Sequence, residues 1–533
     1  MEKLLNKKNL ILAVILIAIL VTGFMPVQFA SAEEIANKNK VPRMVTVTFW
    51  GQDGTQMSFN WNTTDYTDSD VWVVEADDAS GFNSAKVIKT QGEYHISRAS
   101  ASDGFIHTCV VSGLKLGTKY LYKVGDAELN IFSEVGSFTT ESGDSKPFTF
   151  IHVSDPQSDA ENYYKIYKEV LRSAVDNCKP SFIVNTGDIV NNNWLGYVPN
   201  LDQWEWALTD TFEVMKDYPI VATAGNHEAA DYDFASRFNF DTPSSASTKS
   251  GVYYSFNYNN AHFIALNTND TTDPHSSSAT GLSDEQINWL KSDLEANKEA
   301  KWKIVMMHKA FYDCGDGGNN TLGTDYDVMV MRKQLAPLFT QYGVDLVLQG
   351  HDHLYSKSYP LSSRLDSEGE VISNATTTET IKKEYNGGMY DFYNNPNGTI
   401  YINSGSASGW KVFNPVQNYP TDLIEKADKG TVMYTAVTVD GENLFVHTYT
   451  LDGKFESVPY YSFGVAKTAL NNSNDTTAML PVWALTLIIV ASVLIVICAV
   501  ILATVFILKS KRKNVIPNEI STEEKSENTE NKL

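Results

Sequence analysis

The chain has 533 residues, a formal net charge of −22 and four cysteines. This acidic balance argues against nucleic acid or anionic lipid as a partner, and the sequence shows no nucleic-acid-binding patch. An anionic substrate would need local positive charge, most simply from metal ions. The length suggests two or three domains with a sizeable core.

Both ends of the chain carry membrane signals. Residues 1–32 combine a lysine-rich start, a short apolar run and an A-x-A cleavage pattern, which predicts a signal peptide; an uncleaved anchor is the alternative. The uncharged apolar stretch 480–508 is long enough for a transmembrane helix. Basic residues follow it, so the positive-inside rule predicts a cytoplasmic tail over 509–533. We expect a single-pass protein of the cell membrane, anchored by its C-terminal helix, with a polar stalk over 466–479 and the part before the stalk extracellular.

Residues 41–141 carry the pattern of an all-β domain. Two histidines in this segment, His95 and His107, have no carboxylate or second histidine clustered with them, so we expect exposed or packing roles. Short runs of β-favouring residues alternate with turns, which is typical of a β-sandwich. The predicted strands are 45–50, 56–61, 71–76, 105–111, 120–124 and 136–140.

Strands then alternate with helices from residue 147 to residue 458, which predicts an α/β domain after a short polar linker. The expected helices are 160–177, 202–216, 283–297 and 327–342. The expected strands are 148–153, 182–188, 220–224, 252–257, 262–267, 303–307, 346–349 and 399–403, with a final antiparallel pair over 431–450.

The cysteines predict no disulfide framework. Cys498 lies in the apolar stretch, and Cys109, Cys178 and Cys314 are odd in number and share no metal-type spacing. One pair among these three remains an open alternative, but a zinc finger does not fit.

Five of the predicted strands are followed at once by residues that bind metals. Ligands of α/β sheets bind beyond the carboxyl ends of the strands, so we expect these side chains to meet at one edge of a sheet. Carboxylate and amide oxygens mixed with imidazoles suit a pair of divalent first-row metals. Each residue alone is more often structural, and the ordered set is what favours a metal site. The set comprises Asp155, Asp188, Asn226 with His227 and Glu228, His308, and His351 with His353.

This ordered set resembles the calcineurin-like metallophosphoesterase superfamily. The β-rich front segment resembles the fibronectin-III-like domain of purple acid phosphatases, including the Leu116–Tyr120 turn and Phe138–Thr140. The resemblance covers about 41–458. It implies a sandwich of two mixed β-sheets flanked by helices, an α/β fold, preceded by the all-β domain. The one transmembrane helix expected from the apolar stretch 480–508 follows this region.

The resemblance also implies roles for single residues. Asp188 would bridge two metal ions, with Asp155 and His353 on the first ion and Asn226, His308 and His351 on the second. A metal-bound hydroxide would attack the phosphorus of a phosphorylated small molecule, most simply a monoester. His227 would assist the leaving group, and Glu228 would orient His227. A phosphodiesterase or nucleotidase with the same metals is one alternative, and a non-catalytic surface-binding module is another.

Two positions depart from the family pattern. Gln157 stands where the family usually has His, and Asn191 stands where the purple enzymes have an iron-binding Tyr. The first ion then has at most neutral amide oxygens as its extra ligand, and Gln157 is the candidate. We expect Mn²⁺, Fe²⁺ or Zn²⁺ instead of a purple ferric centre, with one ion held weakly. His152 alternates into the interior of its strand, so we expect it to be packed.

Overall fold

The computed structural model describes residues 37–467 except for six short gaps. The gaps are 100–102, 144–145, 193–199, 230–231, 272–280 and 318–325. The predicted signal peptide, the membrane helix 480–508 and the tail 509–533 lie outside the described residues. Within those residues no helix is both long and apolar enough to cross a membrane. The chain divides into two compact units, 1–469 and 470–533, and every described residue belongs to the first.

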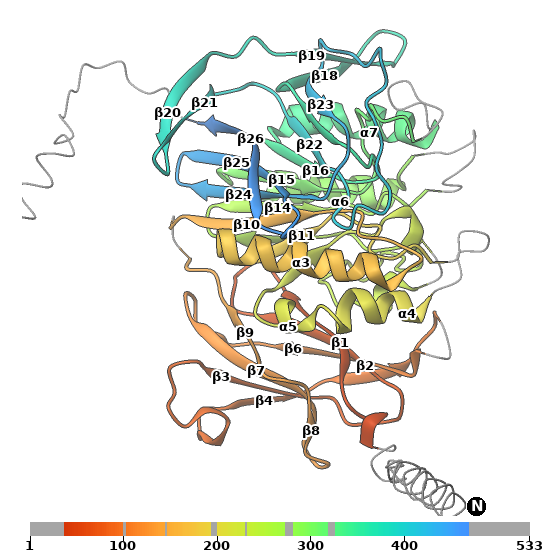
Figure 1. The fold of residues 1–533 in the computed structure, drawn as a ribbon, viewed down its shortest axis with the longest axis vertical. Helices are drawn as coiled ribbons and strands as arrows, with labels where there is room; N and C mark the ends of the chain where they lie inside the picture. The colour runs from red at the N-terminus through yellow and green to blue at the C-terminus, as the bar shows by residue number, and fades with distance from the viewer. Residues whose placement is uncertain are drawn as a thin grey trace, which may run out of the picture. The chain divides into compact units, whose positions relative to one another are not determined.

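The front domain is built from two antiparallel sheets, and all six predicted strands are found there (Figure 1). One sheet has the order β1 (Arg43–Phe49), β2 (Met57–Thr63), β6 (Phe105–Val111) and β5 (Glu93–Ile96). The other has the order β4 (Ile88–Gln91), β3 (Asp70–Glu75), β7 (Lys119–Asp126) and β8 (Ile131–Phe132), with β9 (Gly136–Thr139) beside β7. The strands β4, β5 and β8 were not predicted, because they are short and lack a buried apolar face.

Alternate side chains of strand β2 face the second sheet of the front domain and the α/β domain. Phe59 and Trp61 are fully buried, and Phe59 packs against Phe138 and Tyr122 of the second sheet. The intervening residues point the other way, toward the α/β domain, because the amide of Asn239 donates to the hydroxyl of Ser58 over 2.7 Å. Strand β2 therefore turns a polar face toward the α/β domain, while Phe49 of β1 packs against Phe182 and Phe256 of that domain.

The α/β domain contains two mixed sheets, as predicted. The first has the order β12 (Ile220–Ala222), β11 (Phe182–Asn185), β10 (Phe148–Val153), β24 (Met433–Asp440), β25 (Asn443–Leu451), β26 (Ser457–Ala466), β21 (Gly388–Asn394) and β20 (Thr380–Tyr385). The second has the order β13 (Tyr254–Tyr258), β14 (Ala261–Ala265), β15 (Trp302–Met306), β16 (Leu346–Gln349), β22 (Ile400–Ser404), β17 (Tyr355–Ser358) and β23 (Ile424–Asp428). Strands β18 (Leu361–Leu365) and β19 (Val371–Ala375) form a separate hairpin.

Aromatic side chains join the two sheets face to face. The ring of Phe263 on β14 lies 5.3 Å from that of Phe150 on β10 and 5.4 Å from that of Phe182 on β11. Helix α3 (Glu161–Cys178) covers the outer face of the first sheet (Figure 1). Helices α6 (Asp284–Ala296) and α7 (Tyr326–Tyr342) pack on the second sheet in a shared apolar core. This layered order is the predicted sandwich flanked by helices.

Three expectations about elements need correction. The predicted helix 202–216 is broken into α4 (Leu201–Trp204), a wide turn over Glu205–Thr209 and α5 (Phe212–Met215). The hydroxyl of Thr211 donates to the carbonyl of Ala207 and so competes with the helical backbone pattern. The five strands that precede the site residues belong to two facing sheets and not to one. Finally, β26 extends the fold to Ala466, past the predicted domain end at 458.

Candidate metal centre

The predicted ligands lie on the loops that directly follow β10, β11, β12, β15 and β16. Asp155, Asp188 and His351 adopt left-handed backbone with φ of 52°, 49° and 70°. Non-glycine residues rarely take this conformation, and such strain is typical of functional sites. A Cβ at Gly225 would lie 2.2 Å from an oxygen of Asp188, so only glycine permits this approach of the two loops.

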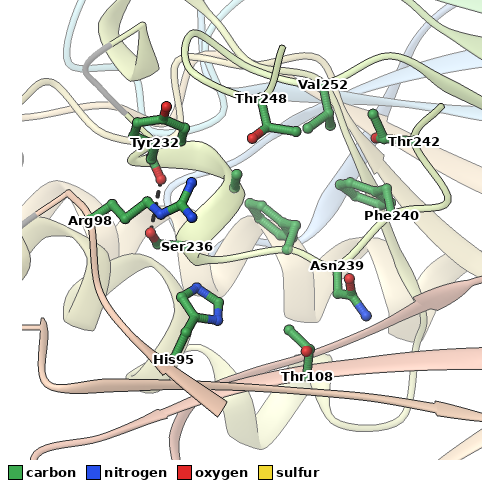
Figure 2. Close-up of a pocket in the computed structure, with 12 residues that line it drawn as sticks. His95, Arg98, Thr108, Tyr232, Ser236, Asn239, Phe240, Thr242, Thr248 and Val252 are labelled. Atoms are coloured by element: carbon green, nitrogen blue, oxygen red, sulfur yellow. Dashed lines mark hydrogen bonds between the residues drawn. The ribbon is translucent and has the colours of Figure 1, made fainter. Parts of the chain in front are cut away.

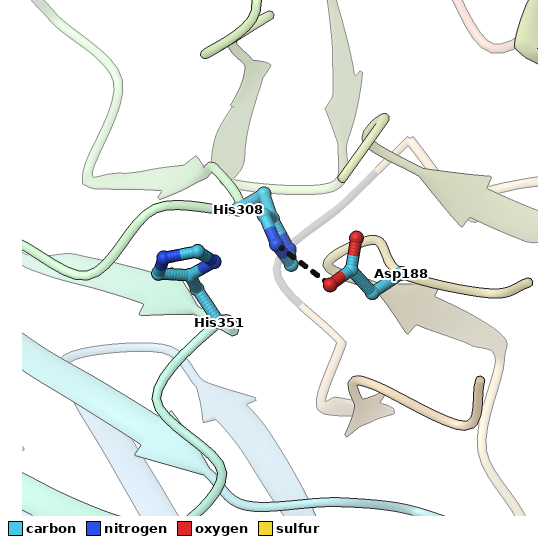
Figure 3. A group of neighbouring side chains, drawn as sticks. All are labelled: Asp188, His308 and His351. Atoms are coloured by element: carbon cyan, nitrogen blue, oxygen red, sulfur yellow. Dashed lines mark ion pairs between the residues drawn. The ribbon is translucent and has the colours of Figure 1, made fainter. Parts of the chain in front are cut away.

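Five acidic and histidine residues form two groups that share the carboxylate of Asp188. Asp188, His308 and His351 bring one donor atom each within 4.8 Å of one another, and Asp155, Asp188 and His353 do the same. Figure 3 shows the ring of His308 directed at Asp188, where Nε2 lies 3.3 Å from Oδ2. The structure therefore brings the predicted bridging residue between the two predicted ligand sets.

The second group has acceptor atoms that converge on one point. Nδ1 of His308 lies 2.8 Å from the carbonyl oxygen of Thr186, which accepts its proton, so Nε2 turns a lone pair toward Asn226. Oδ1 of Asn226 lies 3.0 Å from Nε2 of His308 and 2.9 Å from Nδ1 of His351. A positive charge is needed among these atoms. Burial opposes a charge on His308, but the carboxylate of Asp188 raises the pKa of His308 to about 9. A bound metal ion would take the place of the proton that His308 holds.

The first group repeats this arrangement. Nδ1 of His353 lies 3.2 Å from the carbonyl oxygen of Lys411, which directs Nε2 toward Oδ1 of Asp155 at 3.3 Å. The backbone N–H of His351 donates to the same carboxylate over 3.1 Å. A histidine whose second nitrogen donates to a carbonyl is the usual form of a metal-ligating imidazole. The donor set present thus fits a divalent cation in both groups.

Gln157 lies inside the first group, as predicted. Its Nε2 is 3.1 Å from Oδ2 of Asp188 and 3.2 Å from Nε2 of His353. Its Oε1 is buried and has no hydrogen-bond partner in the described part of the chain. Exchanging the two ends of the amide, which X-ray maps also distinguish poorly, would present the oxygen to an ion. The side chain of Asn191, in contrast, donates to Asp159 over 2.6 Å.

His227 faces the shared carboxylate. Its backbone N–H donates to Oδ1 of Asp188 over 3.0 Å, and its Nε2 lies 3.9 Å from Oδ2. Its Nδ1 lies 2.8 Å from the carbonyl oxygen of Asn191, which fixes the ring orientation. Burial lowers the pKa of His227 despite the neighbouring Asp188. The ring is placed to act on a group bound beside Asp188.

The expected orienting role of Glu228 needs correction. Its carboxylate accepts the backbone N–H groups of Asp188, Val190 and Gly225 at 2.9, 2.9 and 2.7 Å. Burial and the charge of Asp188 raise its pKa to about 8, although the N–H donors oppose this. Glu228 therefore ties two site loops together, and the carbonyl of Asn191 orients His227 instead.

A polar network supports the His227 loop from behind. The amide of Asn192 donates to the carbonyl of His227 and to Asp233, each over 2.8 Å. Arg237 pairs with Asp233 at 3.3 Å and with Asp103 of the front domain at 2.9 Å. Sequence reasoning missed these residues, because no motif marks a buried ion pair between segments distant in the chain. The supporting carbonyls of Thr186 and Lys411 have no sequence signal at all.

The histidines expected to be structural are packed. His107 lies between hydroxyls of Thr63 and Ser69 and stacks on Trp61. His152 is buried between hydroxyls of Thr186 and Ser404, at 2.9 Å from each. Cys109, Cys178 and Cys314 are free, which confirms that the described residues hold no disulfide framework.

Two family comparisons match the two domains in order. Residues 148–355 match the sequence model of the calcineurin-like phosphoesterases, and residues 42–140 match that of the purple acid phosphatase N-terminal domain. The chain thus carries a calcineurin-like metallophosphoesterase domain behind a purple acid phosphatase N-terminal domain, as predicted. The likeness of the front domain to fibronectin III stays a prediction.

Individual relatives agree with these families. A purple acid phosphatase of Glycine max is 30% identical over 280 residues, which are 49% of this chain and 54% of that protein. The Fe(3+)-Zn(2+) purple acid phosphatase 12 of Arabidopsis thaliana is 25% identical over 280 residues, with the same shares of 49% and 54%. The chain therefore spans about half the length of these relatives.

The fold is also that of a solved phosphatase. The structure of a purple acid phosphatase from yellow lupin (Lupinus luteus) superimposes with a TM-score of 0.61 at 17% identity. The match covers 80% of this chain and 75% of the lupin chain. At this identity the likeness shows the shared fold.

Proposed function

We propose that this chain is a dinuclear-metal phosphoesterase that hydrolyses phosphate monoesters. The observation that carries the proposal is the pair of buried donor groups that share Asp188. Two ions held side by side are the usual arrangement for displacement at phosphorus. An anionic phosphate needs local positive charge, which the two ions would supply.

The residues present fit two divalent ions. Asp155, His353 and Gln157 would hold the first ion, Asn226, His308 and His351 the second, and Asp188 both. When bound, the ions would act as Lewis acids on phosphoryl oxygens and activate the attacking water. Amide, carboxylate and imidazole donors suit Mn²⁺, Fe²⁺ or Zn²⁺.

His227 would act on the leaving group. The carbonyl of Asn191 accepts the proton of Nδ1, so the protonated ring directs its second N–H from Nε2. That nitrogen faces the shared carboxylate of Asp188, beside which the phosphoryl group would bind. The ring would therefore donate a hydrogen bond or a proton to phosphate or to the departing oxygen.

We further propose that the protein acts at the cell surface, exported by residues 1–32 and anchored by 480–508. These segments carry the sequence patterns of a signal peptide and a membrane helix. Protease treatment of intact cells tests the orientation. Loss of the front domain with retention of the tail 509–533 supports it, and full protection of the front domain contradicts it.

Activity of the full-length chain with added Mn²⁺ tests the reaction. We expect turnover of an aryl phosphate to exceed that of an aryl phosphodiester. Loss of a residue that only orients a metal ligand costs roughly 10- to 100-fold. His308 is itself a proposed ligand, so His308→Ala should lower the rate by more than that. The control is His447→Ala, because His447 stacks on Tyr449 within β25 at 4.2 Å. Unchanged rates in His308→Ala would contradict the assignment.

The other outcomes decide between the remaining candidates. Faster turnover of the diester or of a nucleotide would favour a phosphodiesterase or nucleotidase, since the metal ligands do not select the ester. No turnover of any ester with metal bound would favour a non-catalytic surface-binding module. Gln157 is the one feature in favour of that last candidate. The joint presence of Asp188, Asn226, His227, His308, His351 and His353 weighs against it, because a structural role does not require this set.

A further inference from the structure

A cavity of about 430 Å³ lies between the front domain and the segment that follows the Asn226–Glu228 turn (Figure 2). His95, Arg98 and Thr108 line it from the front domain. Residues between Tyr232 and Val252 line the opposite side. Its volume falls in the range of small-molecule sites, and it shares no residue with the metal centre.

The cavity is positively charged although the chain is acidic. Its lining contains the guanidinium of Arg98 and no carboxylate, while burial and then the charge of Arg98 lower the pKa of His95. The guanidinium of Arg98 lies over the ring of Tyr232 at 5.2 Å, and within the described ranges it forms no ion pair. Figure 2 shows its N–H groups directed into the space between the two walls. Arginine in such a position recognises carboxylate or phosphate groups through paired N–H donors.

One wall of the cavity is aromatic and rigid. Phe238 and Phe240 are buried, and their rings lie 5.6 Å apart. Phe240 also stacks on Tyr254 at 4.0 Å, so it cannot turn away. A packed aromatic edge of this kind favours contact with a planar ring of a ligand.

A polar atom of the cavity lining has no hydrogen-bond partner among the described residues. The hydroxyl of Thr242, which lines the cavity, is buried without a hydrogen-bond partner among the described residues. Leaving such groups unpaired costs free energy, so the cavity offers unused hydrogen bonds to a bound molecule.

We propose that this cavity binds a small organic anion that carries a planar ring. Arg98 binds the anionic group, the ring packs against Phe240, and Thr242 donates or accepts a hydrogen bond. The site lies apart from the metal ligands and does not depend on bound metal. Its existence is therefore independent of the phosphoesterase proposed above.

Calorimetry on the full-length chain, stripped with EDTA, tests this site without turnover. The probe is phenylphosphonate, with phenylacetate to compare phosphonate and carboxylate, and inorganic phosphate as the anion without a ring. We expect phenylphosphonate to bind at one site and phosphate to bind at least about tenfold more weakly. No binding of either ring-bearing anion would overturn the proposal, and equal binding of phosphate would overturn the role of the aromatic wall.

Variants locate the bound probe. Arg98→Gln should weaken binding at least about tenfold, because a paired charged contact is lost, while the exposed control Arg364→Gln changes nothing. Thr242→Val keeps the shape of the wall and should weaken binding about threefold or more. Both cavity variants should retain the wild-type rate on an aryl phosphate with Mn²⁺. Wild-type affinity in Arg98→Gln would place the probe elsewhere and overturn the assignment.

Discussion

At the scale of single residues, Gln157 distinguishes this site from its family pattern. The amide lies between Asp188 and His353, where an imidazole would be expected from the resemblance. A neutral amide oxygen is a weaker ligand than an imidazole for most first-row metals. The side chain of Asn191, which stands in the position of the iron-binding Tyr, is held by Asp159. The first ion is therefore expected to bind more weakly than the second.

Restoring an imidazole should strengthen that ion. Gln157→His adds a nitrogen donor next to His353, so we expect the weaker of two Mn²⁺ or Zn²⁺ affinities to increase by about tenfold or more. Calorimetric titration of the metal-free chain measures both affinities. Gln203→His is the control, since Gln203 binds the backbone of Asn191 outside the ligand set. The placement of Gln157 would be contradicted if Gln203→His strengthened the weaker metal affinity as well, or if Gln157→His left that affinity unchanged.

The buried His107 should make the folded front domain less stable in acid. Burial lowers the pKa of His107 to about 4, against about 6.5 in an unfolded chain. Below pH 6.5 the unfolded state binds a proton that the folded state does not, so stability falls until pH 4 is reached. The full effect is about 3 kcal/mol. Thermal unfolding between pH 7 and pH 4.5 should show a smaller acid loss in His107→Gln, and an unchanged slope would refute the argument.

At the scale of elements, the apolar strands were predictable, including those that deliver ligands, and the short or exposed strands were not. Four strands are short apolar runs followed by a predicted ligand, so the apolar pattern and the ligand residue mark the same place in the sequence. These strands are β10, β11, β15 and β16. Strands β19 and β20 contain no buried residue, and β20 is mostly polar, which weakens the apolar signal. The pairing of five loops from two sheets, and the backbone role of Glu228, depend on packing between distant segments. No local pattern encodes those contacts.

The strand β26 sets the minimum length of the folded domain. It pairs with β25 on one side and with β21 on the other, so it is an interior strand of the first sheet. A fragment ending at Val458 removes nearly all of it and exposes two unpaired edges. We expect the fragment 37–467 to unfold cooperatively on heating, and 37–458 to aggregate or lack a transition by circular dichroism. Equal stability of both fragments would show that β26 is dispensable.

At the scale of the described unit, buried charge joins the front domain to the α/β domain. Arg237 is fully buried and pairs with Asp103 from one domain and Asp233 from the other. Asp233 also holds Asn192, which donates to the carbonyl of His227. The front domain thus supports the loop that carries a proposed catalytic residue.

Removing that arginine should destabilise the protein strongly. Arg237→Met leaves two buried carboxylates without their cation, which typically costs about 3–5 kcal/mol. Urea unfolding measures the loss, with the exposed Arg364→Met as the matched control. Because the network ends at His227, activity on an aryl phosphate should also decrease under conditions where the variant is folded. A loss below about 1 kcal/mol would contradict the account of this interface.

The central claim is that two ions share Asp188. Metal analysis of the full-length chain, purified without chelator and supplied with Mn²⁺ or Zn²⁺, tests it most directly. The account predicts two ions per chain in the wild type, at most one in His308→Ala, and activity that follows occupancy. A wild-type chain without bound first-row metal, or His308→Ala with the same two ions, would contradict it.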